Sequence, residues 1–179
     1  MNKYIQKLIK EQFNISDLDF SDEQEYSNNI FNKELNHRYY YKVLDGTVTR
    51  NEIKELNSLF GVAVPKDKDE LRKIIEFYSK NYPKDSLNWL DVSGITDMSH
   101  LFEETLYDGD ISKWDTSNVT NMQRMFHYAI DFNQPIGDWN VSGVTDMCGM
   151  FRYAEKFNQD ISKWNTSKVV TMERMFENA

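Results

Sequence analysis

The strongest constraint on this 179-residue chain is a 25-residue repeat that fills its second half. Four residue columns recur in phase: Trp114/Trp139/Trp164, Met122/Met147/Met172, Met125/Met150/Met175 and Phe126/Phe151/Phe176. A fixed period of this kind indicates stacked units, because no single unit can bury its apolar face without its neighbours. The strict phase of the methionines favours core packing over an adaptable, Met-rich binding groove.

The first copy of the repeat is looser than the later copies. Its residues lie 24 positions before those of the second copy, so that Leu90 aligns with Trp114. One residue is missing between Phe102 and Tyr107 relative to the later copies. A first copy that departs from the consensus is typical of a capping repeat.

Each copy predicts a short strand, a turn and a helix. In the segment 157–164, Phe157 and Ile161 share one face and polar residues the other, as in a half-buried strand. Residues at helical spacing follow in the second copy: Met122, Met125, Phe126 and Ala129. Because stacked strands lie closer together than packed helices, the coils should curve with the strands on the concave side. The predicted class is therefore α/β, with four 24–25-residue strand-turn-helix coils.

The first 85 residues predict a small, mainly helical domain. Apolar residues at helical spacing occur in the segments 3–13 and 49–61 and again after Asp67. The third helix begins with the capping sequence Asp67-Lys68-Asp69-Glu70 and precedes Pro83. We therefore expect two domains, 1–85 and 86–179, with the third helix placed to cover the first end of the stack.

Charge and composition restrict the function classes. The net charge is −8, and the segments 1–85 and 86–179 contribute −1 and −7. Binding of DNA or RNA needs basic groups to neutralise phosphates, so direct nucleic-acid binding is not expected. Lysines interrupt the apolar residues at the N-terminus, and no run is long enough to span a membrane. We expect a cytoplasmic protein as the sequence stands, and cell-surface placement only if a leader was removed.

No residue pattern supports catalysis, a cofactor or a metal site. The three histidines have no metal-ligand spacing: His37, His100 and His127. The lone Cys148 has no neighbouring base, and Tyr39, Tyr40 and Tyr41 are interpreted as packing within a small domain. A calcium ladder through Asp110 and Asp160 is not favoured, because Pro135 interrupts it. We expect a non-enzymatic protein without a cofactor.

The consensus of the repeat is Phe-Asn-Gln-x-Ile-x-x-Trp-x-x-Ser-x-Val-Thr-x-Met-x-x-Met-Phe-x-x-Ala. It resembles the repeat of the BspA-like leucine-rich-repeat family, including the mycoplasma-type lipoprotein repeats of unknown function. The resemblance covers residues 87–179. It implies a right-handed, leucine-rich-repeat-like solenoid and a role in protein–protein contact, often at a bacterial surface.

The sequence favours a protein–protein interaction module of bacterial or phage origin. One alternative is an acidic inhibitor that docks on a basic, nucleic-acid-binding protein surface. The other is a surface adhesin whose leader is missing. Strong dependence of binding on ionic strength would favour the inhibitor, and fractionation of the native protein with membranes would favour the adhesin.

The partner surface is predicted on the solvent side of the strands. Its residues are short, polar and acidic: Asp108, Asp110, Ser112, Asn133, Asn158, Asp160 and Ser162, with Pro135 and Gly137 in the middle coil. They suit a protein with a basic surface better than a small ligand. The alternative surface lies on the predicted helix side, around Arg124, Tyr128, Arg152 and Tyr153. The C-terminal edge of the repeats is predicted to hold a partner or a second copy of the chain.

Overall fold

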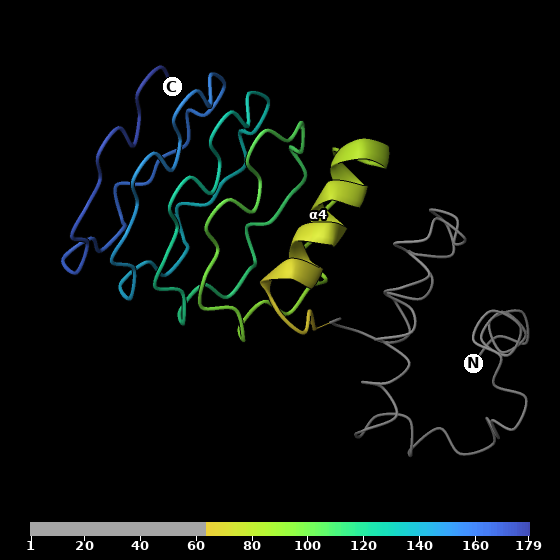
Figure 1. Ribbon diagram of the computed structural model, residues 1–179, viewed down its shortest axis with the longest axis horizontal. Helices are drawn as coiled ribbons and strands as arrows, with labels where there is room; N and C mark the ends of the chain where they lie inside the picture. The colour runs from red at the N-terminus through yellow and green to blue at the C-terminus, as the bar shows by residue number, and fades with distance from the viewer. Residues whose placement is uncertain (1–63) are drawn as a thin grey trace, which may run out of the picture. The chain divides into compact units, whose positions relative to one another are not determined.

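The computed structural model describes residues 64–179, and the segment Pro65–Ala179 forms one compact unit. Within it, helix α4 (Lys68–Asn81) comes first and lies against a stack of repeated coils (Figure 1). We define the coils as residues 87–110, 111–135, 136–160 and 161–179. The predicted helices over 3–13 and 49–61, His37 and the three consecutive tyrosines lie outside the described residues. The helix that was predicted within the domain 1–85 packs with the repeats.

Local sequence explains where α4 begins and which face it buries. The side chain of Asp67 caps the helix by accepting the Glu70 backbone N–H at 3.0 Å. The Glu70 carboxylate in turn accepts the Lys66 N–H at 2.6 Å, one residue earlier than in a standard capping box. The predicted apolar stripe is confirmed, because these residues are at most 2% exposed: Leu71, Ile74, Ile75 and Tyr78.

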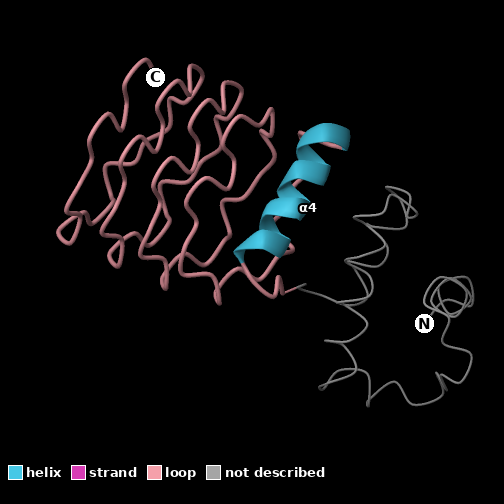
Figure 2. Cartoon of the chain, viewed as in Figure 1, coloured by secondary structure: helices cyan, strands magenta, loops and turns pink. Residues whose placement is uncertain are grey.

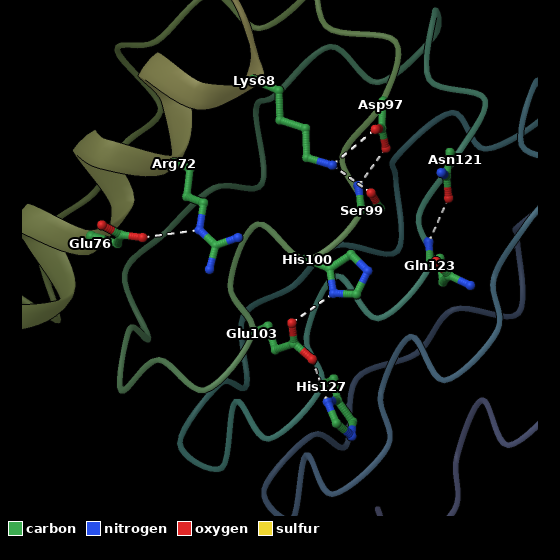
Figure 3. A network of polar contacts seen from close by, with 10 residues as sticks. All are labelled: Lys68, Arg72, Glu76, Asp97, Ser99, His100, Glu103, Asn121, Gln123 and His127. Carbon is green, nitrogen blue, oxygen red and sulfur yellow. Dashed lines mark hydrogen bonds and ion pairs between the residues drawn. The ribbon is translucent and has the colours of Figure 1, made fainter.

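Helix α4 makes polar contacts with the first coil near both of its ends, and Figure 3 shows those of Lys68. Near its start, the Lys68 ammonium donates to the Asp97 carboxylate at 2.9 Å and to the Ser99 hydroxyl. Near its end, the Ser79 hydroxyl accepts the backbone N–H of Leu106 at 3.1 Å. These contacts place the apolar face of α4 over the first coil, which is the position that the sequence predicted.

A ladder of backbone hydrogen bonds joins each coil to the next. Alternate N–H groups donate to carbonyls of the following coil at 2.8–3.0 Å: Met98, His100, Phe102 and Glu104 in the first, Met122, Arg124, Phe126 and Tyr128 in the second, and Met147, Gly149, Phe151 and Tyr153 in the third. Parallel bridges connect the same columns at Asp97, Asn121, Asp146 and Thr171. We call this set of bonds the backbone ladder.

Aromatic columns fill the interior of the stack. The rings of Phe102, Phe126 and Phe151 stack with centroids 5.1 and 5.4 Å apart, and all three residues are 0% exposed. The indole N–H of Trp139 donates at 3.2 Å to the backbone carbonyl of Ile111 in the preceding coil. The rings therefore remove apolar area from water, and the indole of Trp139 also satisfies a backbone carbonyl of the preceding coil.

The predicted α/β solenoid of strand-turn-helix coils is wrong. Within residues 64–179 the structure contains one helix, α4, and no strand or sheet (Figure 2). The predicted helix at Met122 does not form because Arg124 and Tyr128 have φ angles of 51° and 55°. The other coils have left-handed residues at the equivalent positions: His100 and Glu104, Gly149 and Tyr153, and Arg174 and Asn178. An α-helix needs right-handed angles throughout, so the chain makes three-residue turns instead, with Met125 donating to Met122 at 3.2 Å.

The segments predicted as strands are also not strands. Around Asn133 and Asn158, side chains rather than backbone pairs connect neighbouring coils. The coils approach closely here, and a Cβ added at Gly137 would overlap the backbone carbonyl of Asp160. Because the coils of residues 87–179 contain neither strands nor helices, the predicted concave surface of strands does not form.

Candidate interaction surface

The predicted acidic surface begins at Asp108, whose carboxylate is largely enclosed. Its side chain is 14% exposed and pairs with Lys84. It accepts the backbone N–H of Asn133 and the side-chain amide of Gln134, both at 2.8 Å. Asp108 therefore connects the first coil to the second, and its carboxylate is already occupied by partners within the chain.

The same arrangement recurs one coil later with an amide in place of the carboxylate. Asn133 Oδ1 accepts the backbone N–H of Asn158 and the side-chain amide of Gln159, both at 2.9 Å. Among the described residues, the Asn158 side chain accepts no such bond, because the described part of the fourth coil ends at Ala179, before the position 25 residues after Asn158. Three of the predicted partner-binding residues thus form a column that joins coils: Asp108, Asn133 and Asn158.

The other four predicted residues stabilise the turns at which one coil passes into the next. Asp110 accepts the backbone N–H of Ser112 at 2.9 Å, and Asp160 accepts that of Ser162 at 2.9 Å. Such side-chain-to-backbone bonds fix turns locally. Asp160 and Ser162 are exposed, whereas Asp110 and Ser112 are half-buried. Their partner-binding role remains a prediction.

The aspartates of this surface are held in their charged form. Partial burial alone would raise the pKa of Asp108, but hydrogen bonds from Lys84, Gln134 and Asn133 lower the pKa below its usual value. Bonds from the backbone and hydroxyl of Ser162 lower the pKa of Asp160. Lysines one coil away pair with two further acids, joining Lys156 to Asp131 and Lys163 to Asp138. The local field is therefore less negative than the count of acids suggests.

A second surface is formed by the turns that the sequence predicted as helices. The rings of Tyr128 and Tyr153 stack with centroids 4.3 Å apart and an interplanar angle of 11°. The guanidinium of Arg152 lies 5.0 Å from the centre of the Tyr153 ring and also pairs with Glu177 at 2.9 Å. Arg124 is exposed, and among the described residues it has no acidic partner. We call Arg124, Tyr128, Arg152 and Tyr153 the Tyr/Arg surface.

Large apolar residues are exposed in the same turns as the Tyr/Arg surface or in the equivalent turn of the first coil. Tyr128 is 42% exposed, Ile130 is 38% exposed, and Leu106 in the preceding coil is 55% exposed. Large apolar side chains of this kind cost free energy when they remain in contact with water. Exposed apolar side chains at Tyr128 and, two residues later, at Ile130 offer area that another protein can bury.

A carboxylate between two imidazoles supports this surface from the first coil (Figure 3). Glu103 contacts Nδ1 of His100 at 2.6 Å and Nδ1 of His127 at 2.8 Å. Partial burial would raise the pKa of Glu103, but the bonds from His100 and His127 lower it. The His127 ring also lies edge-on against Tyr128, with centroids 4.6 Å apart. The cluster thus holds the first two coils together beneath the tyrosine pair.

The contact between Glu103 and His127 follows from the repeat period of the sequence and not from the spacing of the histidines. Glu103 and His127 are separated by 24 residues, which equals the offset between the first and second copies. Residues one period apart lie side by side in a stack, so His127 and His100 are close although they seemed unrelated. Across residues 64–179, no three His, Cys, Asp or Glu side chains gather as metal ligands would.

Comparisons with known proteins give one family. Residues 70–179 match the family described as "Mycoplasma protein of unknown function, DUF285". No curated protein and no solved structure matches the chain. In the part of the chain that the structure describes, no helix has the length and apolar character needed to cross a membrane.

Proposed function

The chain belongs to the DUF285 family of Mycoplasma proteins of unknown function, and from that premise we propose that its repeats bind another protein without catalysing a reaction. The observation that carries this proposal is the stacked Tyr128–Tyr153 pair beside Arg152 and Arg124. Tyrosine and arginine are the residue types that contribute most to binding at protein interfaces. We place the contact on the Tyr/Arg surface.

The tyrosine pair is held in place before any partner binds. Tyr128 stacks on Tyr153 and contacts the His127 ring, and its backbone N–H donates to the carbonyl of Arg152 at 2.9 Å. A side chain that is already ordered loses little conformational entropy on binding. The free energy gained by burying the exposed ring area therefore contributes more fully to affinity.

The acidic inhibitor is less well supported by the contacts. Asp108, the centre of the predicted acidic surface, carries bonds from Lys84, Asn133 and Gln134. A basic partner would have to replace these bonds, and the coils would lose a connection in the process. Steering by the net charge of −8 remains available to any basic partner.

Affinity capture from the source organism tests the proposal, with the wild-type protein and two variants as bait. Tyr128→Ser with Tyr153→Ser removes the aromatic pair, and Asn158→Ala with Asp160→Ala alters the predicted acidic surface. We expect the second variant to retain the partner and the first to bind it at least about tenfold more weakly, since interface tyrosines commonly contribute more than about 1.4 kcal/mol.

The Tyr128→Phe, Tyr153→Phe variant separates binding from folding. It keeps both stacked rings and should retain most of the affinity, while circular dichroism confirms that each bait is folded. Full binding by the folded serine variant would contradict the proposed surface. Loss of binding only in the Asn158/Asp160 variant would move the contact to the acidic residues.

A further inference from the structure

The bases around the Tyr/Arg surface lie in two columns of the repeat, and in one of them every base has an acid. This column runs through the four coils as Glu103, His127, Arg152 and Glu177. Nδ1 of His127 contacts the Glu103 carboxylate of the first coil at 2.8 Å. The guanidinium of Arg152 pairs with Glu177 of the fourth coil at 2.9 Å. Both acids of this column are therefore occupied by contacts within the chain.

Arg124 belongs to the neighbouring column, in which the adjacent coils offer no carboxylate. The equivalent residues are His100 in the preceding coil and Gly149 in the following one. The Arg124 side chain lies against this glycine, because a Cβ added at Gly149 would be 3.4 Å from Arg124 Cγ and 3.9 Å from Arg152 Cβ. Arg124 is exposed. Two arginine side chains thus start beside one glycine, and the first of them faces solvent.

The charges of this region leave one positive charge uncompensated in the part of the chain that the structure describes. Two further arginines, Arg152 and Arg174, contact acids. These acids are Glu173 and Glu177, at nitrogen–oxygen distances of 2.9–3.6 Å. The remaining charge is that of Arg124, whose planar guanidinium can donate two parallel N–H groups to one carboxylate. A single positive charge suits a carboxylate better than a phosphate group, which carries about two negative charges.

The tyrosine pair adds an apolar area next to this charge. Tyr128 follows Arg124 by four residues, and its exposed ring stacks on that of Tyr153. Ile130, in the same turn, is also exposed. An ion pair that forms beside such side chains is shielded from water on that side, which strengthens the attraction between its charges. The matching ligand combines a carboxylate with a large apolar side chain.

Glu104 restricts the direction from which a carboxylate can approach. It occupies the position of Tyr128 in the first coil and is exposed. Desolvation and Tyr153 raise the pKa of the Tyr128 phenol, Arg152 acts against this rise, and Glu104 adds to it. The Tyr128 ring therefore lies between a negative charge from the first coil and a positive charge from the third. An acidic group is repelled at the first-coil edge and attracted at the arginine edge.

We propose that the Tyr/Arg surface binds an acidic peptide segment of its partner, in which an Asp or Glu carboxylate pairs with Arg124 and a neighbouring apolar side chain packs on Tyr128 and Tyr153. This inference rests on the proposed function, because it names the chemistry of the partner at the same surface. The contacting segment of the partner is acidic, although the net charge of −8 favours basic partners at long range.

Selection from a random peptide library on the immobilised 179-residue protein tests the inference. We expect the enriched peptides to place Asp or Glu next to an aromatic or aliphatic residue. On Arg124→Glu the selection should change to Lys or Arg at the same place, because the charge that faces the peptide is reversed. The variant should fold, since the left-handed angle of Arg124, φ 51°, is close to that of Glu104, φ 58°.

Fluorescence anisotropy with one enriched acidic peptide measures the contribution of each charge. Arg124→Gln should weaken binding about five- to tenfold. Arg124→Lys should weaken it less, because lysine keeps the charge but loses the paired donors. Lys113→Gln, which removes the same charge from another exposed turn, is the control and should leave binding unchanged. Glu104→Gln should strengthen binding about twofold, because a repelling charge is removed.

The outcomes separate this inference from the proposed function. Enriched peptides that require Tyr128 and Tyr153 but lack acidic residues would overturn the acidic segment and leave the proposed surface in place. An Arg124→Glu variant that still selects acidic peptides, or a wild-type protein that selects basic peptides or none, would also overturn it. Acidic peptides that need Arg124 but bind the Tyr128→Ser, Tyr153→Ser variant fully would instead contradict the role of the tyrosine pair.

Discussion

The two ends of the coil stack differ in how far their apolar residues are covered. At the first end, α4 places Leu71, Ile74 and Ile75 over the first coil and adds polar contacts from Lys68 and Ser79. At the last end, residues that are fully buried in the inner coils remain in contact with water. The comparison teaches that a residue's contribution depends on whether a neighbouring coil is present, because identical residue types occupy both situations.

The largest effect is expected in the phenylalanine column. Phe126→Ala removes a 0% exposed ring that stacks on Phe102 and Phe151, and it should lower the free energy of unfolding by about 3–5 kcal/mol. Phe176→Ala, at the 50% exposed position of the same column, should cost about 1 kcal/mol. Urea denaturation measures both. Equal losses would mean that the column does not depend on its neighbours.

The second-largest loss of stability is expected when a buried side chain of α4 is shortened. Ile75→Ala leaves a cavity between α4 and the first coil and should cost about 2–5 kcal/mol. Because the cap is loosened, binding of a hydrophobic dye should rise with it. Lys73→Ala, on the exposed side of the same helix, is the control and should change stability by less than about 0.5 kcal/mol. A stable protein with unchanged dye binding would show that α4 does not close this end.

The asparagine column offers a matched pair with a smaller effect. Asn133→Ala leaves the N–H of Asn158 and the amide of Gln159 without their acceptor and should cost about 1–2 kcal/mol. Asn158→Ala removes the same side chain at a position where it accepts no such bond among the described residues, so a loss below about 0.5 kcal/mol is expected. Thermal unfolding of the two variants measures both losses of stability. A larger loss at Asn158 than at Asn133 would contradict a dependence of this column on the following coil.

The smallest effect concerns acid pH. The pKa of Asp108 is lowered in the folded state, so the unfolded chain binds the proton more readily. The stability from this carboxylate is therefore present above about pH 4 and is lost as the pH falls through the lower, folded-state pKa. Asp108→Asn should reduce the acid sensitivity of unfolding, measured by urea titrations from about pH 6 to pH 2. An unchanged pH profile would show that the contacts of Asp108 do not favour its charged form.

The stacking period and the core columns could be predicted from the sequence, but the path of the backbone within a coil could not. Met122, Met125 and Phe126 have helical spacing, and successive three-residue turns bury the same positions. A helix and successive turns differ here in the residues with left-handed backbone angles. Glycine and asparagine adopt such angles most readily, so the residue types of Arg124 and Tyr128 do not predict them. Gly149 does argue against a helix in the third coil, because glycine is unfavourable in the middle of a helix.

The candidate site was likewise predictable only in part. Alternation of polar and apolar residues placed Asp108 and Asn158 on a solvent face, although Asp108 is enclosed by the next coil. The repeated pairs Asn133-Gln134 and Asn158-Gln159 carried the missing signal, because amides that recur at the repeat period can bridge one coil to the next. The sequence pattern favours the Tyr/Arg surface only as an alternative, because a helix presents these residues differently from successive turns.

Native-state amide hydrogen exchange tests the central claim most directly, because it reads the backbone ladder one coil at a time. We expect slow exchange at Met147, Gly149, Phe151 and Tyr153, whose N–H groups donate to the fourth coil. Much faster exchange is expected at Met172, Arg174, Phe176 and Asn178, the same four positions without a following coil. Equal protection at the two sets in the isolated, monomeric protein would contradict the account.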